Sequence, residues 1–312
     1  MKNILKRIAE AKHIVVISHI NPDADSLASA SAMYTYLLTL HKKVSFFCLS
    51  KDIHQKLSFL PWFDKIRNSF PSSADLAIAL DCSSQSRIGI EIECDLINID
   101  HHSSNENYAD FNLVSSTSIS TTQVLFDFFK TNKIQINKKM ATALYAGILD
   151  DSDGFLSSDV DGTIFALVNE LISSGAMHHT CNDFILKYRT LASLRLKALM
   201  LSNMSLINNA EIVVFLVKQD DFKATGAAYE DCELALEEAL FLPTVKVTLL
   251  LRENENLAFK GSLRSKKDFD LSSIALELNG GGHKNRIGFE LDTTCTMEKT
   301  VKKIVTLINK EI

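Results

Sequence analysis

A histidine and two aspartates follow directly after an apolar run near the start of the chain. The run IVVI ends at Ile17, and His19, Asp23 and Asp25 come next within the stretch SHINPDADS. Imidazole nitrogens and carboxylate oxygens bind divalent metal ions, whereas Asn, Pro, Asp and Ser also suit a turn that opens a helix. Taken alone, the stretch indicates either a metal site or a turn with a helix N-cap.

Three later segments end in side chains of the same kinds. Those side chains are Asp81 after LAIAL, Asp100, His101 and His102 after LINI, and Asp150, Asp151 and Asp153 after the helical segment 143–149. Ligands of open parallel α/β sheets bind beyond the carboxyl ends of the strands, which meet at one edge. The four segments together therefore predict one shared site, although a single strand-end aspartate is also typical of a turn.

The charges of such a site indicate what it binds. Two carboxylates about 4 Å apart repel by about 4 kcal/mol at an effective dielectric constant of about 20, and their pKa values rise unless a cation is present. Carboxylate and imidazole ligands without a thiolate favour Mn²⁺ or a similar first-row ion over a structural zinc. A shared aspartate could bridge two such ions about 3.5–4 Å apart, the spacing that activates water against a phosphorus centre.

Two stretches in the last third of the chain combine glycine with basic side chains. They are GSLRSKK (261–267) and NGGGHKNRIGF (279–289). Glycine lets a backbone approach an anion closely, and Arg264, His283 and Lys284 offer positive charge. A tight turn after a helix also explains a glycine cluster, so both interpretations stay open at this point.

The elements that position these residues follow the rhythm of a parallel α/β sheet in the first half of the chain. Apolar runs at 14–17, 44–49, 76–81 and 96–100 alternate with helical patterns, the first over 26–40. Helical periodicity then dominates, and its last stretch runs from 184 to about 206. The β-rich runs IVVFLV, VKVTLLL and LAFKGSL return from Ile212, ahead of a C-terminal helix over 297–308.

We therefore predict an α/β protein of two domains, because 312 residues exceed the roughly 100–200 residues of a usual domain. Residues 1–183 are expected to form a catalytic domain around a parallel sheet, and 184–207 a linker helix. Residues 208–312 are expected to form a smaller α/β domain with a mixed sheet. The active site is expected in the cleft between the two domains.

The composition limits the partners and the compartment. A net charge of −5, from 33 basic and 38 acidic residues, gives no field that holds a long nucleic acid. The six cysteines include no CxxC pair, which indicates a reducing cytosol. The N-terminal apolar part is too short for a signal peptide or a membrane span, so we expect a cytoplasmic protein without a membrane partner.

The motifs HINPDADS, ALDCS, DHH, GILDDSDGF, SLRSK and GGGHK occur in this order along nearly the whole chain. Together they resemble a DHH-family phosphoesterase with a DHH-associated C-terminal domain, and the pattern is most similar to the NrnA-like branch of nanoRNases and pAp phosphatases. The resemblance implies two Mn²⁺ ions, with Mg²⁺ or Co²⁺ as alternatives. It implies that the first ion is held by His19, Asp23 and Asp81, and the second by Asp25, Asp81, His101 and Asp151.

The resemblance also implies roles for the remaining motif residues. Asp100 would orient the neighbouring imidazole, and His102 would lie near the scissile phosphate as a polariser or proton partner. A terminal phosphate or base would be bound by the second domain, through Arg264, Gly280, Gly281, Gly282, His283, Lys284 and Arg286.

The sequence departs from the family pattern at three places. Ala24 replaces a glycine in the first motif, and Asp153 replaces a glycine in the fourth, which leaves Asp150, Asp151 and Asp153 as alternative ligands. The spacing from the flanking Gly and Phe of GILDDSDGF selects Asp151. Arg286 stands where a small residue is usual, so it either adds a phosphate contact or narrows the pocket.

The resemblance implies a metal-dependent phosphodiesterase that hydrolyses very short RNAs and linear dinucleotides such as pGpG and pApA to 5′-mononucleotides. A phosphatase acting on 3′-phosphoadenosine 5′-phosphate (pAp) and a cyclic-dinucleotide phosphodiesterase are the alternatives. A nucleotide-binding regulator without catalysis is the rival of another class, but it would have lost at least one ligand. We further expect a homodimer.

Overall fold

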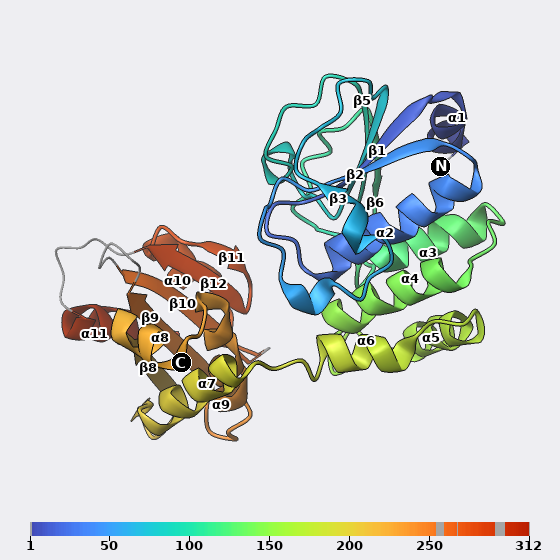
Figure 1. The fold of residues 1–312 in the computed structure, drawn as a ribbon. Coiled ribbons are helices and arrows are strands. Elements are labelled where there is room, and N and C mark those ends of the chain that lie inside the picture. The colour runs from blue at the N-terminus through green and yellow to red at the C-terminus, as the bar shows by residue number, and fades with distance from the viewer. Residues whose placement is uncertain (1, 254–258, 267, 291–296, 312) are drawn as a thin grey trace. The chain divides into compact units, whose positions relative to one another are not determined.

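The computed structural model describes residues 2–253, 259–266, 268–290 and 297–311 (Figure 1). The chain divides into two compact units, one ending at Tyr188 and the other beginning at Arg189. Each unit has its own sheet and its own hydrophobic core. No described helix is both long enough and apolar enough to cross a membrane.

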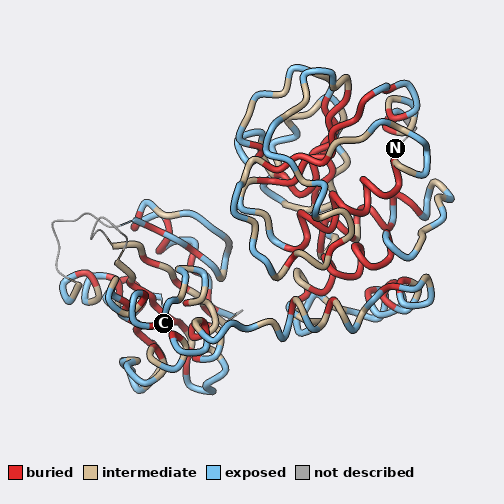
Figure 2. The backbone as a smooth tube through the Cα atoms, viewed as in Figure 1, coloured by how far each residue is buried: buried red, intermediate tan, exposed pale blue. Residues whose placement is uncertain are grey.

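The first unit is built on a sheet of six parallel strands in the order β3-β2-β1-β4-β5-β6. Its strands are β1 (His13–Ser18), β2 (Lys43–Phe47), β3 (Ile66–Arg67), β4 (Leu76–Leu80), β5 (Asp95–Asp100) and β6 (Phe111–Val114). Every residue of β1 and β4 is buried, which explains why these strands are continuous apolar runs rather than alternating ones (Figure 2). The predicted parallel sheet is confirmed.

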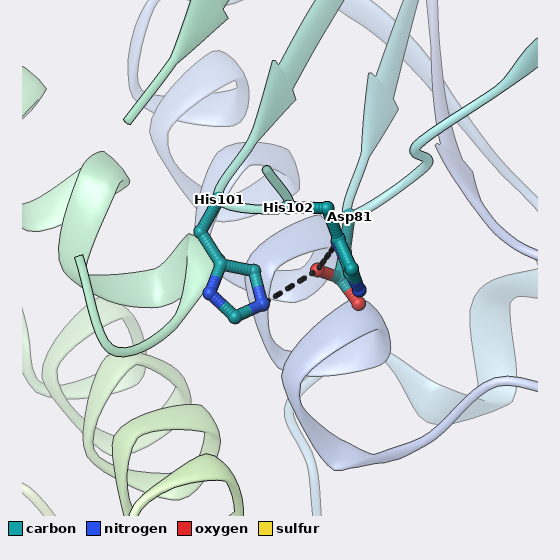
Figure 3. A group of neighbouring side chains, drawn as sticks. All are labelled: Asp81, His101 and His102. Carbon is teal, nitrogen blue, oxygen red and sulfur yellow. Dashed lines mark ion pairs between the residues drawn. The ribbon is translucent and has the colours of Figure 1, made fainter. Parts of the chain in front are cut away.

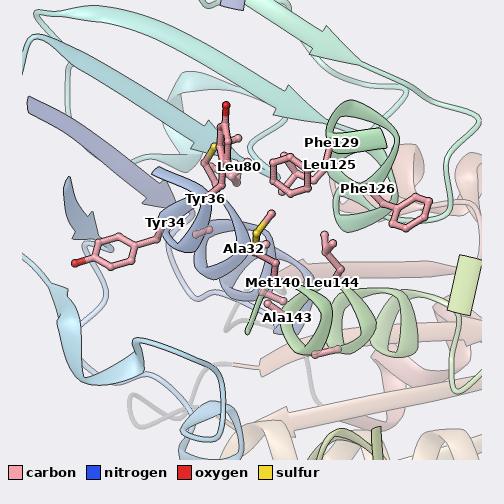
Figure 4. Packing of buried hydrophobic residues seen from close by; sticks show 14 of the residues in the cluster. Ala32, Tyr34, Tyr36, Leu80, Leu125, Phe126, Phe129, Met140, Ala143 and Leu144 are labelled. Atoms are coloured by element: carbon pink, nitrogen blue, oxygen red, sulfur yellow. The ribbon is translucent and has the colours of Figure 1, made fainter. Parts of the chain in front are cut away.

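Helices and short 3-10 turns complete the first unit. They are α1 (Lys2–Glu10), α2 (Ala24–Thr39), α3 (Thr121–Thr131), α4 (Lys138–Asp151), α5 (Gly162–Ser173), α6 (His178–Ile185), η1 (Gln55–Leu57), η2 (Phe63–Lys65) and η3 (Gln85–Arg87). The core joins one face of the sheet to α2, α3 and α4, as Leu80, Phe129 and Leu144 illustrate (Figure 4). The three helices are therefore fixed by apolar burial, with their ends at the edge where β1, β4 and β5 finish.

The second unit has a mixed sheet in the order β11-β12-β10-β9-β8-β7. Its elements are α7 (Leu191–Ser202), β7 (Ser205–Ile207), β8 (Ile212–Val217), α8 (Gln219–Thr225), η4 (Tyr229–Cys232), α9 (Glu233–Leu240), β9 (Val247–Glu253), β10 (Phe259–Ser265), α10 (Ser272–Glu277), β11 (Gly281–His283), β12 (Arg286–Glu290) and α11 (Met297–Ile308). Only β8 and β9 pair in parallel. Val214 and Phe215 belong to separate core clusters, so both faces of this sheet are covered.

The prediction of a single linker helix over 184–207 is wrong. The stretch contains the end of α6, a connection, all of α7 and the start of β7. The Thr190 hydroxyl accepts a hydrogen bond from the amide of Ser193, and the Thr190 amide donates to the Ser193 hydroxyl, both at 3.0 Å. This capping box starts a new helix, and the division between the two units falls just before it, after Tyr188.

Gly147 on α4 leaves no room for a side chain, because an added Cβ would overlap the Asp25 carboxylate and the side chain of Thr122. Alanine is usually better than glycine in a helix by about 1 kcal/mol, but overpacking destabilises by about 1–3 kcal/mol. We therefore expect Gly147→Ala to lower the free energy of unfolding by about 1–2 kcal/mol in urea denaturation. Gly162→Ala in α5 is the matched control, because nothing lies within 4 Å of its added Cβ. Equal stabilities of the two variants would contradict the close contact at α4.

Candidate metal centre

The predicted ligand residues lie at one edge of the first sheet. His19 follows β1, Asp81 follows β4, and His101 follows β5. These three strands are neighbours in the sheet, so their carboxyl ends are adjacent. The other three predicted ligands, Asp23, Asp25 and Asp151, lie at the start of α2 and at the last residue of α4.

Asp81 faces histidines that follow both neighbouring strands at this edge. Its Oδ2 lies 3.6 Å from His19 Nε2, and its Oδ1 lies 3.7 Å from His101 Nε2. Figure 3 shows the Asp81 carboxylate facing the imidazoles of His101 and His102. The two carboxylate oxygens thus face different imidazoles, which is the arrangement of a carboxylate that bridges two ions.

Three groups could hold an ion by the mutual distances of their donor atoms. Within each group these atoms all lie within 4.8 Å of one another, and the groups are His19, Asp23 and Asp81; Asp81, His101 and His102; and Asp25, His101 and Asp151. All six predicted ligands belong to at least one group. The donors are oxygen and nitrogen atoms only, and this set fits a first-row or hard divalent ion.

Asp23 satisfies both interpretations of the first motif at once. Its Oδ1 accepts a hydrogen bond from the amide of Ser26 at 2.9 Å, which makes it the N-cap of α2. Its Oδ2 lies 3.6 Å from Nε2 of His19. The turn and the ligand group therefore use different oxygens of one carboxylate.

Asp81 adopts a left-handed backbone conformation with a φ of 60°, which is unfavourable for a residue other than glycine and recurs at functional sites. The carbonyl of the next residue, Cys82, is held by three donors: Asn98 Nδ2 at 3.0 Å, Tyr108 Oη at 3.2 Å and Asn105 Nδ2 at 3.3 Å. These contacts fix the backbone that aims the Asp81 carboxylate. The sequence interpretation missed these donors, which carry no motif of their own.

Asp25 is fully buried at the N-terminus of α3. It accepts hydrogen bonds from the amides of Thr121 and Thr122, at 2.7 and 3.1 Å, and from the Thr122 hydroxyl at 2.7 Å. The Thr121 hydroxyl donates to Asp81 Oδ1 at 2.7 Å. The N-terminus of α3 stabilises negative charge here, because Thr121 and Thr122 donate their hydrogen bonds to the carboxylate. The sequence interpretation did not identify these two threonines.

The crowding of carboxylates changes how these groups bind protons. Burial and the charge of Asp81 raise the pKa of Asp25 well above its usual range, and burial and the charge of Asp25 do the same to the pKa of Asp151. Burial lowers the pKa of His19, but hydrogen bonds with Asp23 and Asp81 raise it more, to about 9. Without a cation, protons therefore offset part of the charge, as expected of a metal-binding donor set.

Asp100 contacts His102 rather than His101 through its side chain. His102 Nδ1 lies 2.8 Å from Asp100 Oδ1, and Asn105 Nδ2 donates to the other oxygen at 2.6 Å. The hydrogen bond that His102 donates to Asp100 raises the pKa of His102. Burial raises the pKa of Asp100, but the hydrogen bonds from His102 and Asn105 lower it below its usual value. The contact therefore favours the ionised form of Asp100 and the protonated form of His102.

The three aspartates at the end of α4 have different surroundings. Asp151 Oδ2 lies 3.4 Å from His101 Nε2 and joins the group with Asp25. Asp150 Oδ2 instead accepts a hydrogen bond from the amide of Ala24 at 3.2 Å. Asp153 is exposed in the turn after the helix. The geometry thus agrees with Asp151, the residue that the motif spacing selected.

The predicted substrate-binding residues lie in the second unit. Arg264 is paired with Glu233, with Nη2 to Oε1 at 2.8 Å and Nε to Oε2 at 3.1 Å, and Arg286 is paired with Glu237 at 3.4 Å. Arg264 and Arg286 lie opposite each other on β10 and β12.

Of the predicted glycine-rich segment from Gly280 to His283, residues 281–283 form β11 against β12 rather than a tight turn. A Cβ on Gly282 would overlap the Arg286 carbonyl oxygen, so close strand pairing explains this glycine. Lys284 lies in the turn that follows and is exposed, and the side chain of His283 lies outside what the structure describes.

Arg87 is a further residue of the centre that the sequence did not single out. It lies at the end of η3, in the loop after β4. Its Nη2 lies 3.2 Å from both ring nitrogens of His19. The only sequence signal was a basic residue shortly after Asp81.

Comparisons with known proteins show similarity to one family of phosphoesterases over most of the chain. Residues 13–148 match the DHH family, N-terminal domain. The bifunctional oligoribonuclease and PAP phosphatase NrnA of Thermus thermophilus is 25% identical, with 96% of this chain and 90% of that protein covered. The protein of the same name from Bacillus subtilis is 24% identical, with 90% of each covered. The crystal structure of an exopolyphosphatase-related protein from Bacteroides fragilis has a TM-score of 0.90 at 25% identity, covering 99% of this chain and 95% of that one.

Binding of Mn²⁺ is expected to release protons, because metal ligands must be deprotonated while the pKa values of His19, Asp25 and Asp151 are raised without the ion. As the pH falls from about 8 to about 6, protons compete better and the apparent Mn²⁺ affinity should fall. Isothermal titration calorimetry near pH 7, in two buffers of different ionisation enthalpy, counts the protons released. The Asp151→Asn variant should release fewer protons per bound Mn²⁺ than the wild type. Identical binding heats in both buffers would contradict the expectation.

Proposed function

We propose that this chain is a DHH-family, metal-dependent hydrolase of very short RNAs, since residues 13–148 match the DHH N-terminal domain and the chain is similar to NrnA over nearly its whole length. Linear dinucleotides such as pGpG and pApA are included as substrates, with 5′-mononucleotides as products. The names of the relatives, oligoribonuclease and PAP phosphatase, favour the removal of a phosphate from pAp as a second activity. A cyclic-dinucleotide phosphodiesterase is the remaining enzymatic alternative.

The observation that carries this proposal is the position of Asp81, whose two oxygens face His19 and His101 separately. We assign one ion to His19, Asp23 and Asp81, and a second to Asp25, Asp81, His101 and Asp151. Mn²⁺ is proposed for both, since the donors are oxygen and imidazole nitrogen. Two bound ions would lower the pKa of a water molecule and offset the charge that develops on the phosphate.

A thiolate is not expected to join these ligands. Cys82 is the neighbour of Asp81 in the chain, but its thiol is buried and donates to the Leu80 carbonyl at 3.4 Å. Burial and the charges of Asp81 and Asp100 raise its pKa well above the usual range. This thiol therefore stays protonated, which supports an ion that prefers oxygen and nitrogen over one that prefers sulfur.

His102 is proposed to donate a proton to the oxygen that leaves the phosphorus centre. Its Nδ1 is hydrogen-bonded to Asp100, so its tautomer and orientation are set. A general acid must carry its proton before the reaction, and the hydrogen bond to Asp100 raises the pKa of His102 and so favours its protonated form.

The second unit is proposed to bind the end of the substrate through Arg264, Arg286, Lys284 and the segment from Gly280 to His283. Arg264 supports this role because a guanidinium binds a phosphate with two parallel hydrogen bonds. Glu233 occupies that bidentate position without substrate, so an incoming phosphate must displace or share the Glu233 carboxylate.

A regulator that binds nucleotides without catalysis remains the rival of another class. Such a protein would no longer need a complete ligand set, whereas His19, Asp23, Asp25, Asp81, His101 and Asp151 are all present. The complete set supports the enzyme. The cytoplasmic location and the homodimer stay predictions.

The test of the proposed function is hydrolysis by protein that is stripped of metal and then supplied with Mn²⁺. Four substrates are followed in parallel: pGpG, pApA, a five-nucleotide RNA and pAp. We expect turnover of the dinucleotides and of pAp with Mn²⁺ and none after chelation. Turnover of pAp alone would leave only the phosphatase, and binding without turnover of any substrate would favour the regulator.

Asp81→Asn should reduce turnover by more than about a hundredfold, because an amide is a poor bridge between two cations. Asparagine tolerates the left-handed backbone at this position, so the fold should be retained. Asp153→Asn is the matched control, since Asp153 is also left-handed, with a φ of 53°, but is exposed and outside the ligand groups. An Asp81→Asn enzyme with the rate of the Asp153→Asn enzyme would remove the bridging role.

Arg264→Ala should raise KM by about tenfold and change kcat less. The reason is that the lost contact binds the substrate and the transition state equally. Glu233→Gln should lower KM, since it removes the carboxylate that competes with the phosphate. Circular dichroism before the assay tests whether both variants stay folded. A wild-type KM in both variants would exclude Arg264 from substrate binding.

A further inference from the structure

Arg87 brings a permanent positive charge into a centre made of carboxylates and imidazoles. Its guanidinium contacts His19 at 3.2 Å through Nη2. Within the described part of the chain, the hydrogen bonds and ion pairs of the six proposed ligands involve no other arginine and no lysine. The residue as a whole is exposed, so a ligand can reach it.

The contact between Arg87 and His19 gives the guanidinium no hydrogen-bond acceptor once His19 holds a metal. The Nδ1 of His19 lies 2.8 Å from the carbonyl oxygen of Ile20, to which it must donate its hydrogen. A divalent ion would therefore bind at Nε2, the nitrogen that faces Asp23 and Asp81 at 3.6 Å. With Nδ1 donating to Ile20 and Nε2 bound to the ion, neither ring nitrogen could accept a hydrogen bond from the guanidinium.

A bound divalent ion would also repel the neighbouring guanidinium. The backbone nevertheless keeps Arg87 close, because its carbonyl accepts a hydrogen bond from the Ile20 amide at 2.9 Å. The next residue in the chain, Ile88, is fully buried and anchors the loop. The backbone of Arg87 thus stays beside the centre while its side chain can reorient, and an anion at the ions would offer the guanidinium a partner there.

We propose that Arg87 binds the phosphate of the nucleotide at the metal centre once His19 has bound its ion. The guanidinium suits this role because it is always charged and presents paired donors to phosphate oxygens. The guanidinium would offset part of the negative charge of the phosphate, next to the ion that His19 holds. This inference rests on the proposed function, and it assigns Arg87 to the phosphate group shared by a 5′-mononucleotide product and a short RNA substrate.

Binding measurements on the Mn²⁺-loaded full chain test this role without relying on turnover. AMP is the probe, and adenosine, which lacks the phosphate, is its control in isothermal titration calorimetry. Arg87→Ala should weaken AMP binding by about tenfold to a hundredfold, the value of a hydrogen bond between charged groups. Arg87→Lys should give an intermediate affinity, because it keeps the charge but loses the paired donors. Adenosine binding should be the same in all variants.

Mn²⁺ affinity separates a phosphate contact from a structural role. Removing a cation beside the site should leave the Mn²⁺ affinity of Arg87→Ala equal to or above that of the wild type. If Arg87 only positioned His19, Mn²⁺ and AMP would both bind more weakly. Arg67→Ala is the matched control, since Arg67 is likewise an exposed arginine of this unit but donates to the carbonyls of Asp64 and Ile66.

The outcomes distinguish this inference from the proposed function. AMP binding that is equal in wild type and Arg87→Ala, or absent from the wild type, would overturn the role of Arg87. A parallel loss of Mn²⁺ and AMP affinity would overturn it as well. Arg87-dependent AMP binding in a protein that hydrolyses none of the four substrates would overturn the proposed function and leave the phosphate contact standing.

Discussion

Repulsion between carboxylates at one buried sheet edge is the constraint on which this structure depends. Asp25 accepts a hydrogen bond from the amide of Thr121, and Asp81 accepts one from the hydroxyl of the same threonine. Asp25 and Asp151 share one group of possible metal ligands. Burial and mutual repulsion raise the pKa values of two of them well above their usual range. Backbone amides at the start of α3 and protonated imidazoles relieve part of this charge. A divalent cation bound by these groups would relieve the rest, and the charge at this edge would then depend on the metal.

Rigidity around Asp81 is the second requirement. A left-handed aspartate is unfavourable by itself, and such strain persists only where the surroundings enforce it. The enforcement comes from the Cys82 carbonyl, which accepts hydrogen bonds from Asn98, Asn105 and Tyr108. Asn105 also donates to Asp100, so one side chain links the backbone of the bridging aspartate to the acid that orients His102. The centre is therefore held by a polar network as much as by the apolar core beneath it.

In the second unit the like charges that lie close together are positive, and carboxylates neutralise them. Arg264 and Arg286 lie opposite each other on adjacent strands, where like charges destabilise, and each is paired with a glutamate of α9. The glutamates stand in for an anion, so the basic pair stays neutralised without substrate. Close strand pairing explains Gly280 and Gly282, since a side chain on either would overlap the backbone of the facing strand. The basic side chains, rather than these two glycines, are therefore the groups proposed to bind an anion in this unit.

Which chemistry the protein carries was determined by the sequence alone, because residue types and their positions after apolar runs are local properties. The runs predict parallel strands, and the rule that such strands end at one edge places His19, Asp81 and His101 together. The tertiary structure alone decided the finer assignments, because they depend on contacts between distant segments. It decided that Asp151 rather than Asp150 faces His101, that Asp100 contacts His102, and that Arg87 reaches His19. It also divided the stretch expected as one linker helix, where the helical pattern concealed a capping box at Thr190.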